Sequence, residues 1–519
     1  MNSSDSTQPK INPWLIAFAV ILPTFIEVLD TTVVSVALPT IAGNLSATIS
    51  QATWIQTGYL ISNAIVLPAS AWFSGVFGRK RFLMLCIGIF TVASFACGAA
   101  PNLSSLIIAS IVQGAGGGAL QPISQAILME SFPPAKRGMA MAAYVLGVVF
   151  APVVGPVLGG WLTENYSWWW IFYINIPCGL VALWMVQQFV FDPEYIRNAK
   201  VGRIDALGFL VLAIWLGTLQ TVLNKGQDDD WFNSNFICTL SVISVIAFVA
   251  FVVREFKARE PLADLRVFAD RNFLFSNILI AIIFFLLYGI MNLQPLLAQG
   301  LMGYTAYGSG LTQISRGWGM LALTPLVGYL VGKWDSRLLV GAGMIITAVA
   351  SLLMGNFNLD MSSHAYFWPN FYQGMGIALT SVPLMTVAMS TIRNEEMGNA
   401  TGLFALVRNL AGSIGIAVAI AMQSRGALRH QAYLTAHVTP FDLPYQNAVQ
   451  MGQAALTPAM GAAQAAPGTL GVIYKSVLLQ SNMQAFADEF RWLALLCFLS
   501  VPLVLVFKKT QARKDLVLH

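Results

Sequence analysis

Apolar runs of roughly 18–25 residues recur along the whole chain, each long enough to cross the hydrocarbon core of a bilayer as a helix. This pattern limits the fold more than any other feature. Only 10% of the 519 residues are charged, whereas a soluble protein usually carries about 25%. The runs also lack the alternation of polar and apolar residues that is typical of barrel strands. The sequence therefore predicts an all-α polytopic membrane protein.

The apolar runs divide the chain into about fourteen expected transmembrane helices. They cover residues 13–38, 52–75, 82–100, 104–129, 139–162, 169–190, 205–223, 235–253, 273–297, 308–331, 338–356, 367–391, 399–423 and 490–507. Most connections between them are short. Residues 424–489 form the exception, and we expect a long loop there that either docks a partner or is mobile.

Positively charged residues gather on one side of this topology. Of the 28 Lys and Arg residues, 21 fall in the termini and the loops of one side, five fall on the other side, and Arg316 and Arg408 lie inside spans. Cytoplasmic loops carry such an excess, so both termini are expected in the cytoplasm. The small net charge of +5 therefore indicates a membrane face and no nucleic-acid partner.

The two halves of the chain resemble each other at an offset of about 260 residues. The segment SIVQGAGGGALQP (110–122) parallels NFYQGMGIALTSVP (370–383), and KRGMAMAAY (136–144) parallels EMGNATGLF (396–404). Two six-helix bundles with a two-helix insert account for this distance, and such repeats facing a midplane cavity are typical of transporters. The expected domains are an N-terminal bundle (1–190), the insert with a cytoplasmic linker (191–271), a C-terminal bundle with its periplasmic loop (272–508), and a cytoplasmic tail (509–519).

Four ionisable residues fall well inside the expected spans: Glu27, Asp30, Arg316 and Arg408. Each costs ~2.5–3.5 kcal/mol to insert and normally faces a cavity or a partner. Glu27 and Asp30 share one helix face, and an acid removed from water can gain and lose a proton as its surroundings change. We expect them to carry protons. In the alternative, Asp30 only ties helices together, for example through Arg408. The arginines either balance the acids, attract an anionic substrate, or form structural ion pairs.

Polar side chains recur at helical spacing in two further spans. Because polar groups avoid lipid, we expect them to line a substrate cavity. They are Gln56, Tyr59 and Asn63 in the second span, and Gln113, Gln121, Ser124 and Gln125 in the fourth.

Several segments together resemble a known family. They are LDTTVVSVALP (29–39), GVVFAPVVGPVLGG (147–160), PPAKRGMA (133–140), WWWIFYINIPCG (168–179), RNLAGSIG (408–415) and QAFADEF (484–490). From about residue 14 to 508 the chain resembles the EmrB-type, fourteen-helix drug:proton antiporters of the major facilitator superfamily. The sequence departs from the family pattern at Gly75, where an Asp is usual, and at Ser110, where an Arg is usual.

This resemblance implies a function and partners. The chain would export amphipathic, hydrophobic drugs, including antibiotics, in exchange for protons by alternating access. It would lie in the inner membrane and work with a periplasmic adaptor of the membrane-fusion type and an outer-membrane channel, with residues 424–489 as the adaptor contact. The resemblance also implies an antiporter-motif gate in the fifth span, formed by Gly147, Pro152, Gly155, Pro156, Gly159 and Gly160.

Other functional classes find little support in the sequence. The five cysteines show no CxxC spacing, GAGGGALQ (114–121) lacks the Lys and hydroxyl residue of a phosphate-binding loop, and no Ser-His-Asp or metal-like cluster is evident. We therefore expect neither a cofactor nor an enzyme. The remaining alternative is a passive facilitator or channel in which the buried acids set only selectivity.

Overall fold

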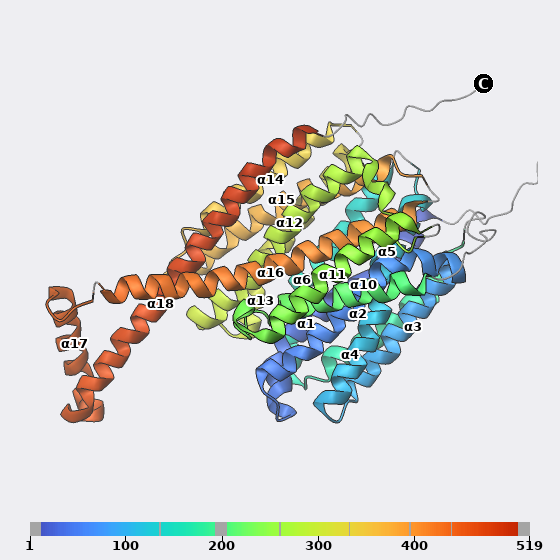
Figure 1. The fold of residues 1–519 in the computed structure, drawn as a ribbon. Helices are drawn as coiled ribbons and strands as arrows, with labels where there is room; N and C mark the ends of the chain where they lie inside the picture. Colours follow the sequence, from blue (N-terminus) through green and yellow to red (C-terminus); the bar gives the residue numbers. More distant parts are fainter. Residues whose placement is uncertain are drawn as a thin grey trace, which may run out of the picture.

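The computed structural model describes residues 12–133, 136–192, 205–258, 261–331, 333–393, 396–436 and 438–506, and it is almost wholly helical over them (Figure 1). The predicted cytoplasmic tail, 509–519, lies outside the described residues. Hydrogen-bonding side chains begin many of the helices. Thr48 and Gln51 form a capping box at the start of α2 (Ile49–Phe77), and Asp270 accepts from the backbone N–H of Phe273 at the start of α12 (Arg271–Pro295).

The first bundle consists of helices from the N-terminal part of the chain. Besides α2, these are α1 (Pro13–Asn44), α3 (Arg79–Gly98), α4 (Leu103–Gly117), α5 (Leu120–Ser131), α6 (Arg137–Asn165), α7 (Trp170–Tyr173) and α8 (Asn175–Phe189). The helices α4 and α5 form one span of 29 residues, Leu103–Ser131. The break between them falls at Gly118, where a Cβ would lie 2.4 Å from the carbonyl oxygen of Asn63. Glycine there lets two helix backbones approach closely.

The second bundle repeats the helix packing of the first. Its helices are α12, α13 (Ala306–Leu330), α14 (Ser336–Met354), α15 (Ser363–Ser390), α16 (Met397–Ala436) and α18 (Ala462–Ser500). The helix α12 packs on α16 as α1 packs on α6, and α15 packs between α13 and α14 as α4 packs between α2 and α3. The two bundles meet where α6 packs against α13 and where α16 packs against α2 and α5.

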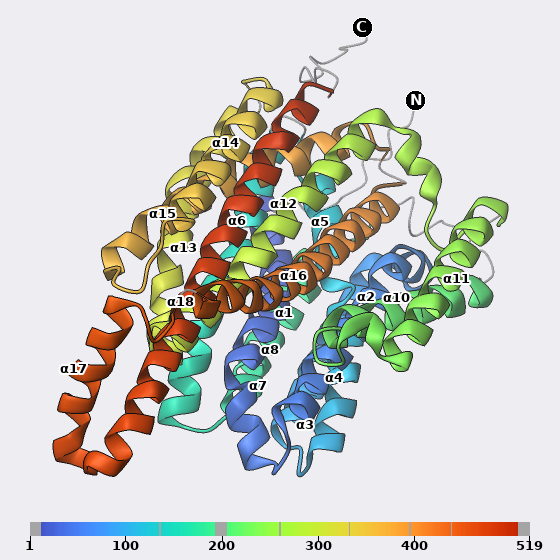
Figure 2. The same ribbon diagram turned by 60° about the vertical axis from the view of Figure 1, so that its left-hand side comes forward.

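The insert consists of two helices, α10 (Ala206–Lys225) and α11 (Asn235–Lys257), that pack against each other (Figure 2). The helix α10 also packs against α2, whereas α11 leaves many large apolar side chains exposed, among them Val245 and Ile246. An apolar face of this kind is suited to lipid. Two six-helix bundles and a two-helix insert were predicted, and the structure confirms this fold.

Twelve helices of the described residues are long and apolar enough to cross a membrane. Two further predicted spans, 308–331 and 367–391, correspond to α13 and α15, which are 25 and 28 residues long but less apolar. Both helices carry buried polar side chains, including Arg316 and Gln373. These polar groups lower the mean hydropathy of both helices, but they are buried inside the protein. Counting α13 and α15 as spans therefore brings the total close to fourteen.

The long loop expected at 424–489 is not an irregular loop, which corrects the sequence prediction. The helix α16 runs for 40 residues from Met397 to Ala436, α17 covers Leu443–Met460, and α18 runs for 39 residues to Ser500. The helix that contains the predicted last span therefore begins well before residue 490. The segment is rich in alanine and glutamine, which favour helices. We call the described residues of 424–489 the helical arm; it projects from the bundles (Figure 1).

Candidate functional site

Glu27 lies in the interior of the first bundle, where it is buried and held by two amide side chains. Asn63 Nδ2 in α2 donates to one carboxylate oxygen at 2.9 Å, and Gln121 Nε2 in α5 donates to the other at 2.5 Å. Three helices, α1, α2 and α5, therefore converge on this acid.

Asp30 lies one turn further along α1 and has a second, separate pair of amide donors. Gln113 Nε2 in α4 donates to Asp30 Oδ1 at 3.0 Å, and Asn175 Nδ2 at the start of α8 donates to the same oxygen at 2.5 Å. Sequence reasoning missed Asn175. The only signal for it was a single buried amide in the otherwise apolar and aromatic stretch WWWIFYINIPCG.

Neither acid forms an ion pair within the part of the chain that the structure describes. The alternative in which Asp30 ties helices through Arg408 is therefore not what the structure shows. Amide donors stabilise a carboxylate without adding a fixed positive charge. Among the described residues, neither acid therefore has a cation as a direct partner.

The polar residues predicted to line a substrate cavity are buried or half-buried around the acids in this structure. Asn63, Gln113 and Gln121 hold the acids, and Gln56 Nε2 donates to the Thr31 carbonyl oxygen at 3.4 Å. Tyr59 is buried close to Glu27. Both side chains lie next to Gly117, where an added Cβ would be 2.7 Å from the Tyr59 hydroxyl and 3.2 Å from Glu27 Cγ. Ser124 and Gln125 are buried, and the Ser124 hydroxyl and the Gln125 amide have no hydrogen-bond partner among the described residues.

Arg316 is a fully buried arginine of the second bundle. Its guanidinium donates to Gln294 at 2.5 Å, to Gln373 at 2.8 Å and to Asn370 at 2.9 Å, with Gln313 at 3.4 Å. All four acceptors are neutral amide oxygens of the same bundle. Among the described residues Arg316 has no carboxylate partner, so neither the predicted ion pair between bundles nor a direct contact with the acids is present.

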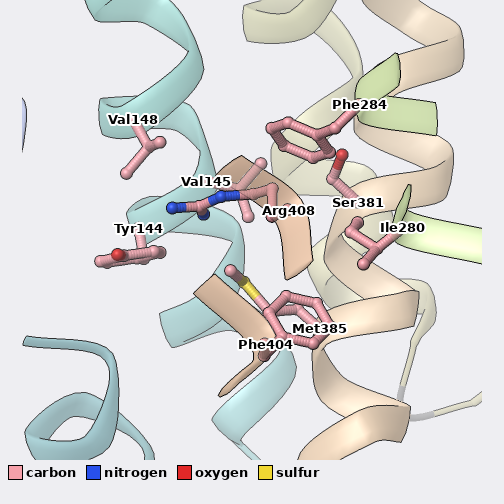
Figure 3. Close-up of a pocket in the computed structure, with 9 residues that line it drawn as sticks. All are labelled: Tyr144, Val145, Val148, Ile280, Phe284, Ser381, Met385, Phe404 and Arg408. Carbon is pink, nitrogen blue, oxygen red and sulfur yellow. The ribbon is translucent and has the colours of Figure 1, made fainter. Parts of the chain in front are cut away.

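Arg408 occupies a different place from Arg316, in a pocket between the bundles (Figure 3). The helix α6 contributes Tyr144, Val145 and Val148 to this pocket, and α12, α15 and α16 contribute the rest. The guanidinium lies 5.4 Å from the centre of the Phe284 ring and points toward Tyr144. Arg408 is also an electrostatic neighbour of Glu27, so the pocket adjoins the acid network.

The antiporter-motif residues of α6 lie at its contact with α1. A Cβ on Gly155 would lie 2.0 Å from Thr32 Oγ1, and one on Gly159 would lie 3.0 Å from the Val33 carbonyl oxygen. On the other side, α6 packs against α13 of the second bundle. Pro152 and Pro156 lie inside this helix. The motif therefore lies between the helix that carries the acids and the opposite bundle, with Gly147 against Ile21 and Gly160 buried.

The two departures from the family pattern lie in different surroundings. Near Gly75, a short ion pair joins Arg79 to Glu130 at 2.6 Å, and Asp192 accepts from the backbone N–H of Lys80 at 2.8 Å. Ser110 is buried, with its hydroxyl 3.7 Å from the Cys97 sulfur. Glu130 and Asp192 thus bind the segment after the second span, although the Asp usual at position 75 is absent.

Comparison with known proteins yields one family and many relatives. Residues 20–416 match the model of the Major Facilitator Superfamily. The chain is 37% identical over 429 residues to the multidrug export protein EmrB of Escherichia coli, covering 82% of this chain and 83% of that protein. It is 33% identical over 492 residues to the fatty acid resistance protein FarB of Neisseria gonorrhoeae, covering 94% of each.

Two solved structures share the fold at low sequence identity. The human organic anion transporter MFSD10 superposes with a TM-score of 0.58 at 13% identity, covering 94% of this chain and 100% of that one. The proton:xylose symporter XylE superposes with a TM-score of 0.58 at 14% identity, covering 94% of this chain and 96% of that one. These two likenesses concern the fold alone.

Proposed function

The chain belongs to the Major Facilitator Superfamily, and from this premise we propose that it exports amphipathic, hydrophobic compounds in exchange for protons. The observation that carries the proposal is the burial of Glu27 and Asp30 in a membrane-spanning helix, held by amides and free of any ion pair within the described residues. Two relatives are named for multidrug export and for fatty acid resistance. Transport of drug-like molecules is the function that these names support.

Transport would proceed by alternating access, with the bundles rocking about a midplane site. A proton that enters from outside contributes ~2.3 kcal/mol per 100 mV of membrane potential. Asp30 and Glu27 would take up protons when the interior is open to the outside and release them inside. The α6 motif would seal the path between α1 and the second bundle during this change, and Arg316 would keep the second bundle rigid.

We further propose an inner-membrane location with cytoplasmic termini and a role in a tripartite system. The bias of Lys and Arg supports the orientation. It assigns the helical arm to the periplasm, and the arm lies at the same end of the molecule as the turn between α3 and α4 (Figure 2). A periplasmic adaptor would contact the arm and connect the transporter to an outer-membrane channel.

Substrate-dependent proton flux in reconstituted vesicles tests the coupling. The parent protein should release protons when a transported drug is added, and Asp30→Asn should abolish this release while drug binding remains. Glu27→Gln tests the second acid in the same way. Stoichiometric proton movement by Asp30→Asn would contradict the proposed role.

A passive facilitator is the second candidate. The tight packing of the polar residues gives it no support. The cavity-lining residues predicted from the sequence are buried against one another, so no continuous polar path is evident in the described residues. A facilitator would equilibrate drug across the vesicle with no dependence on a proton gradient. An exporter would accumulate drug against its concentration gradient when a proton gradient is imposed.

A further inference from the structure

Glu489 in α18 is a buried carboxylic acid outside the network around Glu27 and Asp30. It is 2% exposed, and neither of its carboxyl oxygens has a hydrogen-bond partner among the described residues. By contrast, Glu27 and Asp30 each accept from two amide side chains, and the buried Glu255 accepts from the Ala263 backbone N–H. Within the part of the chain that the structure describes, Glu489 is therefore the buried acid with the least support for a negative charge.

The surroundings of Glu489 are apolar. Phe486 and Leu493 lie on the same face of α18, three residues before it and four residues after it, and both are buried. Ala485 lies one turn earlier on this face, and a Cβ on Gly426 of α16 would be 3.1 Å from Ala485 Cβ. The face of α18 that carries Glu489 is thus packed against α16.

The elements that pack against α18 offer Glu489 no partner. They are α12, α14, α16, α17 and the short helices η4 (Leu296–Leu301) and η6 (Val501–Val506). Their titratable residues are Arg271, Tyr288, Arg337, Arg408, Arg425, Arg429, His430, Tyr433 and Tyr445. None of these side chains donates to Glu489 among the described residues. A carboxylate removed from water needs a cation or hydrogen-bond donors, and without them the neutral form is favoured.

The residue next to Glu489 reaches the surface. The side chain of Asp488 is 47% exposed, lies 2.9 Å from Nε2 of His430 and accepts from Arg491 at 3.2 Å. Glu489 is also the last residue of the helical arm and directly precedes the predicted span 490–507. The aqueous phase on the side of the arm therefore lies close to this acid.

We propose that Glu489 is a third proton-binding site of the transporter, which holds a proton in the conformation seen here and exchanges it with the solution on the side of the helical arm. The site lies in the second bundle, whereas Glu27 and Asp30 lie in the first. Proton binding by Glu489 goes beyond the proposed function, and the part of this proton in drug exchange rests on that function.

Infrared difference spectroscopy of the full chain in lipid nanodiscs measures the protonation state of Glu489. At pH 7.5 the parent should show a carbonyl-stretching band of a protonated carboxylic acid that Glu489→Gln lacks. Transfer into D₂O should shift this band, because the proton exchanges with water. Asp488→Asn, at the adjacent ion-paired acid, is the control and should keep the band. Glu489→Asp keeps a carboxylic acid at this position and should restore a band, which separates the assignment from a folding defect.

Proton release from vesicles measures the part of Glu489 in exchange, with ethidium as the probe. The parent should release one proton more per transported ethidium molecule than Glu489→Gln, whereas Asp488→Asn should match the parent. Ethidium affinity in nanodiscs should differ by less than about twofold between the parent and Glu489→Gln, because the substitution removes a proton site and no drug contact.

Three results would overturn the proposal: no carbonyl band that depends on Glu489, a band that does not shift in D₂O, or an unchanged proton count in Glu489→Gln. Failure of the proposed export function gives a different pattern. The parent would then release no protons with ethidium, while the exchangeable infrared band of Glu489 would remain.

Discussion

Gln113 and Gln373 occupy equivalent positions in the two halves of the chain, yet they bind opposite charges. Gln113 donates through Nε2 to the carboxylate of Asp30, whereas Gln373 accepts through Oε1 from the guanidinium of Arg316. An amide side chain can do both, because it carries a donor and an acceptor at the same tip. The duplicated helix packing thus holds an acid in one bundle and a base in the other.

Loss of the Asn175 donor should impair proton coupling. Asn175→Leu keeps the branched heavy-atom skeleton but cannot donate to Asp30, and a hydrogen bond to a charged group contributes ~1.5–3 kcal/mol. We expect substrate-driven proton release in vesicles to fall by roughly tenfold or more. Asn165→Leu is the control, because Asn165 is exposed and bonds only to the Trp161 carbonyl oxygen of its own helix. Equal rates of proton release for the two variants would show that Asn175 plays no part in proton coupling.

A methyl group at Gly155 should disrupt the contact between α1 and α6. The added Cβ would lie 2.0 Å from Thr32 Oγ1 and 2.9 Å from Thr32 Cβ, and overpacking of this kind costs ~1–3 kcal/mol. Gly155→Ala should therefore lower the thermal unfolding midpoint and the transport rate. Gly88→Ala in α3 meets no atom within 4 Å and should do neither. An unchanged transport rate for Gly155→Ala would contradict the sealing role of the motif.

Arg316 should be essential for the stability of the second bundle. Arg316→Met leaves four amide oxygens without their shared donor, and each buried acceptor left unsatisfied costs ~1–3 kcal/mol. Arg316→Lys should recover little, since an ammonium group lacks the planar fork that reaches Gln373, Gln294 and Asn370 together. Thermal unfolding in detergent measures both variants against Arg266→Lys. A midpoint close to that of the parent would show that the amides reorganise without the cation.

The Asp205–Arg254 pair predicts a pH dependence outside the membrane core. The hydrogen bond from Arg254, at 2.9 Å, holds the pKa of Asp205 below its ordinary value, and Asp205 also caps α10 through the backbone N–H of Gly208. A depressed pKa in the folded state contributes stability above the unfolded pKa of about 4. That contribution is lost as the pH falls through the lower folded value.

Thermal unfolding between pH 3 and pH 7 tests this pair. Asp205→Asn should be less stable than the parent at pH 7 and should approach the parent's stability as the pH falls below about 4. Asp229→Asn, at an exposed residue of the connection between α10 and α11, serves as the control. A constant difference between parent and Asp205→Asn over this range would show that the ion pair contributes nothing.

The helical arm should matter for export across two membranes but not for transport across one. Replacing α17, residues 443–460, by a Gly–Ser segment of equal length removes the end of the arm and leaves the bundles and their acid network in place. We expect substrate-driven proton release in vesicles to persist and drug tolerance of cells to fall to that of a strain without the transporter. Full tolerance in cells would argue against an adaptor contact at α17.

The sequence by itself determined the elements of this protein that depend on local composition and period. Apolar length predicted the spans, the repeat predicted the paired bundles, and helical spacing placed Glu27 and Asp30 on one face. Helix periodicity states which face a side chain lies on, but not which other helix covers that face. Only the tertiary structure decided that Asn175, which is 145 positions away, holds Asp30, and that Arg408 faces a pocket between the bundles. The helical arm was likewise missed, because its alanine-rich residues lack the apolar length that marks a span and are helical all the same.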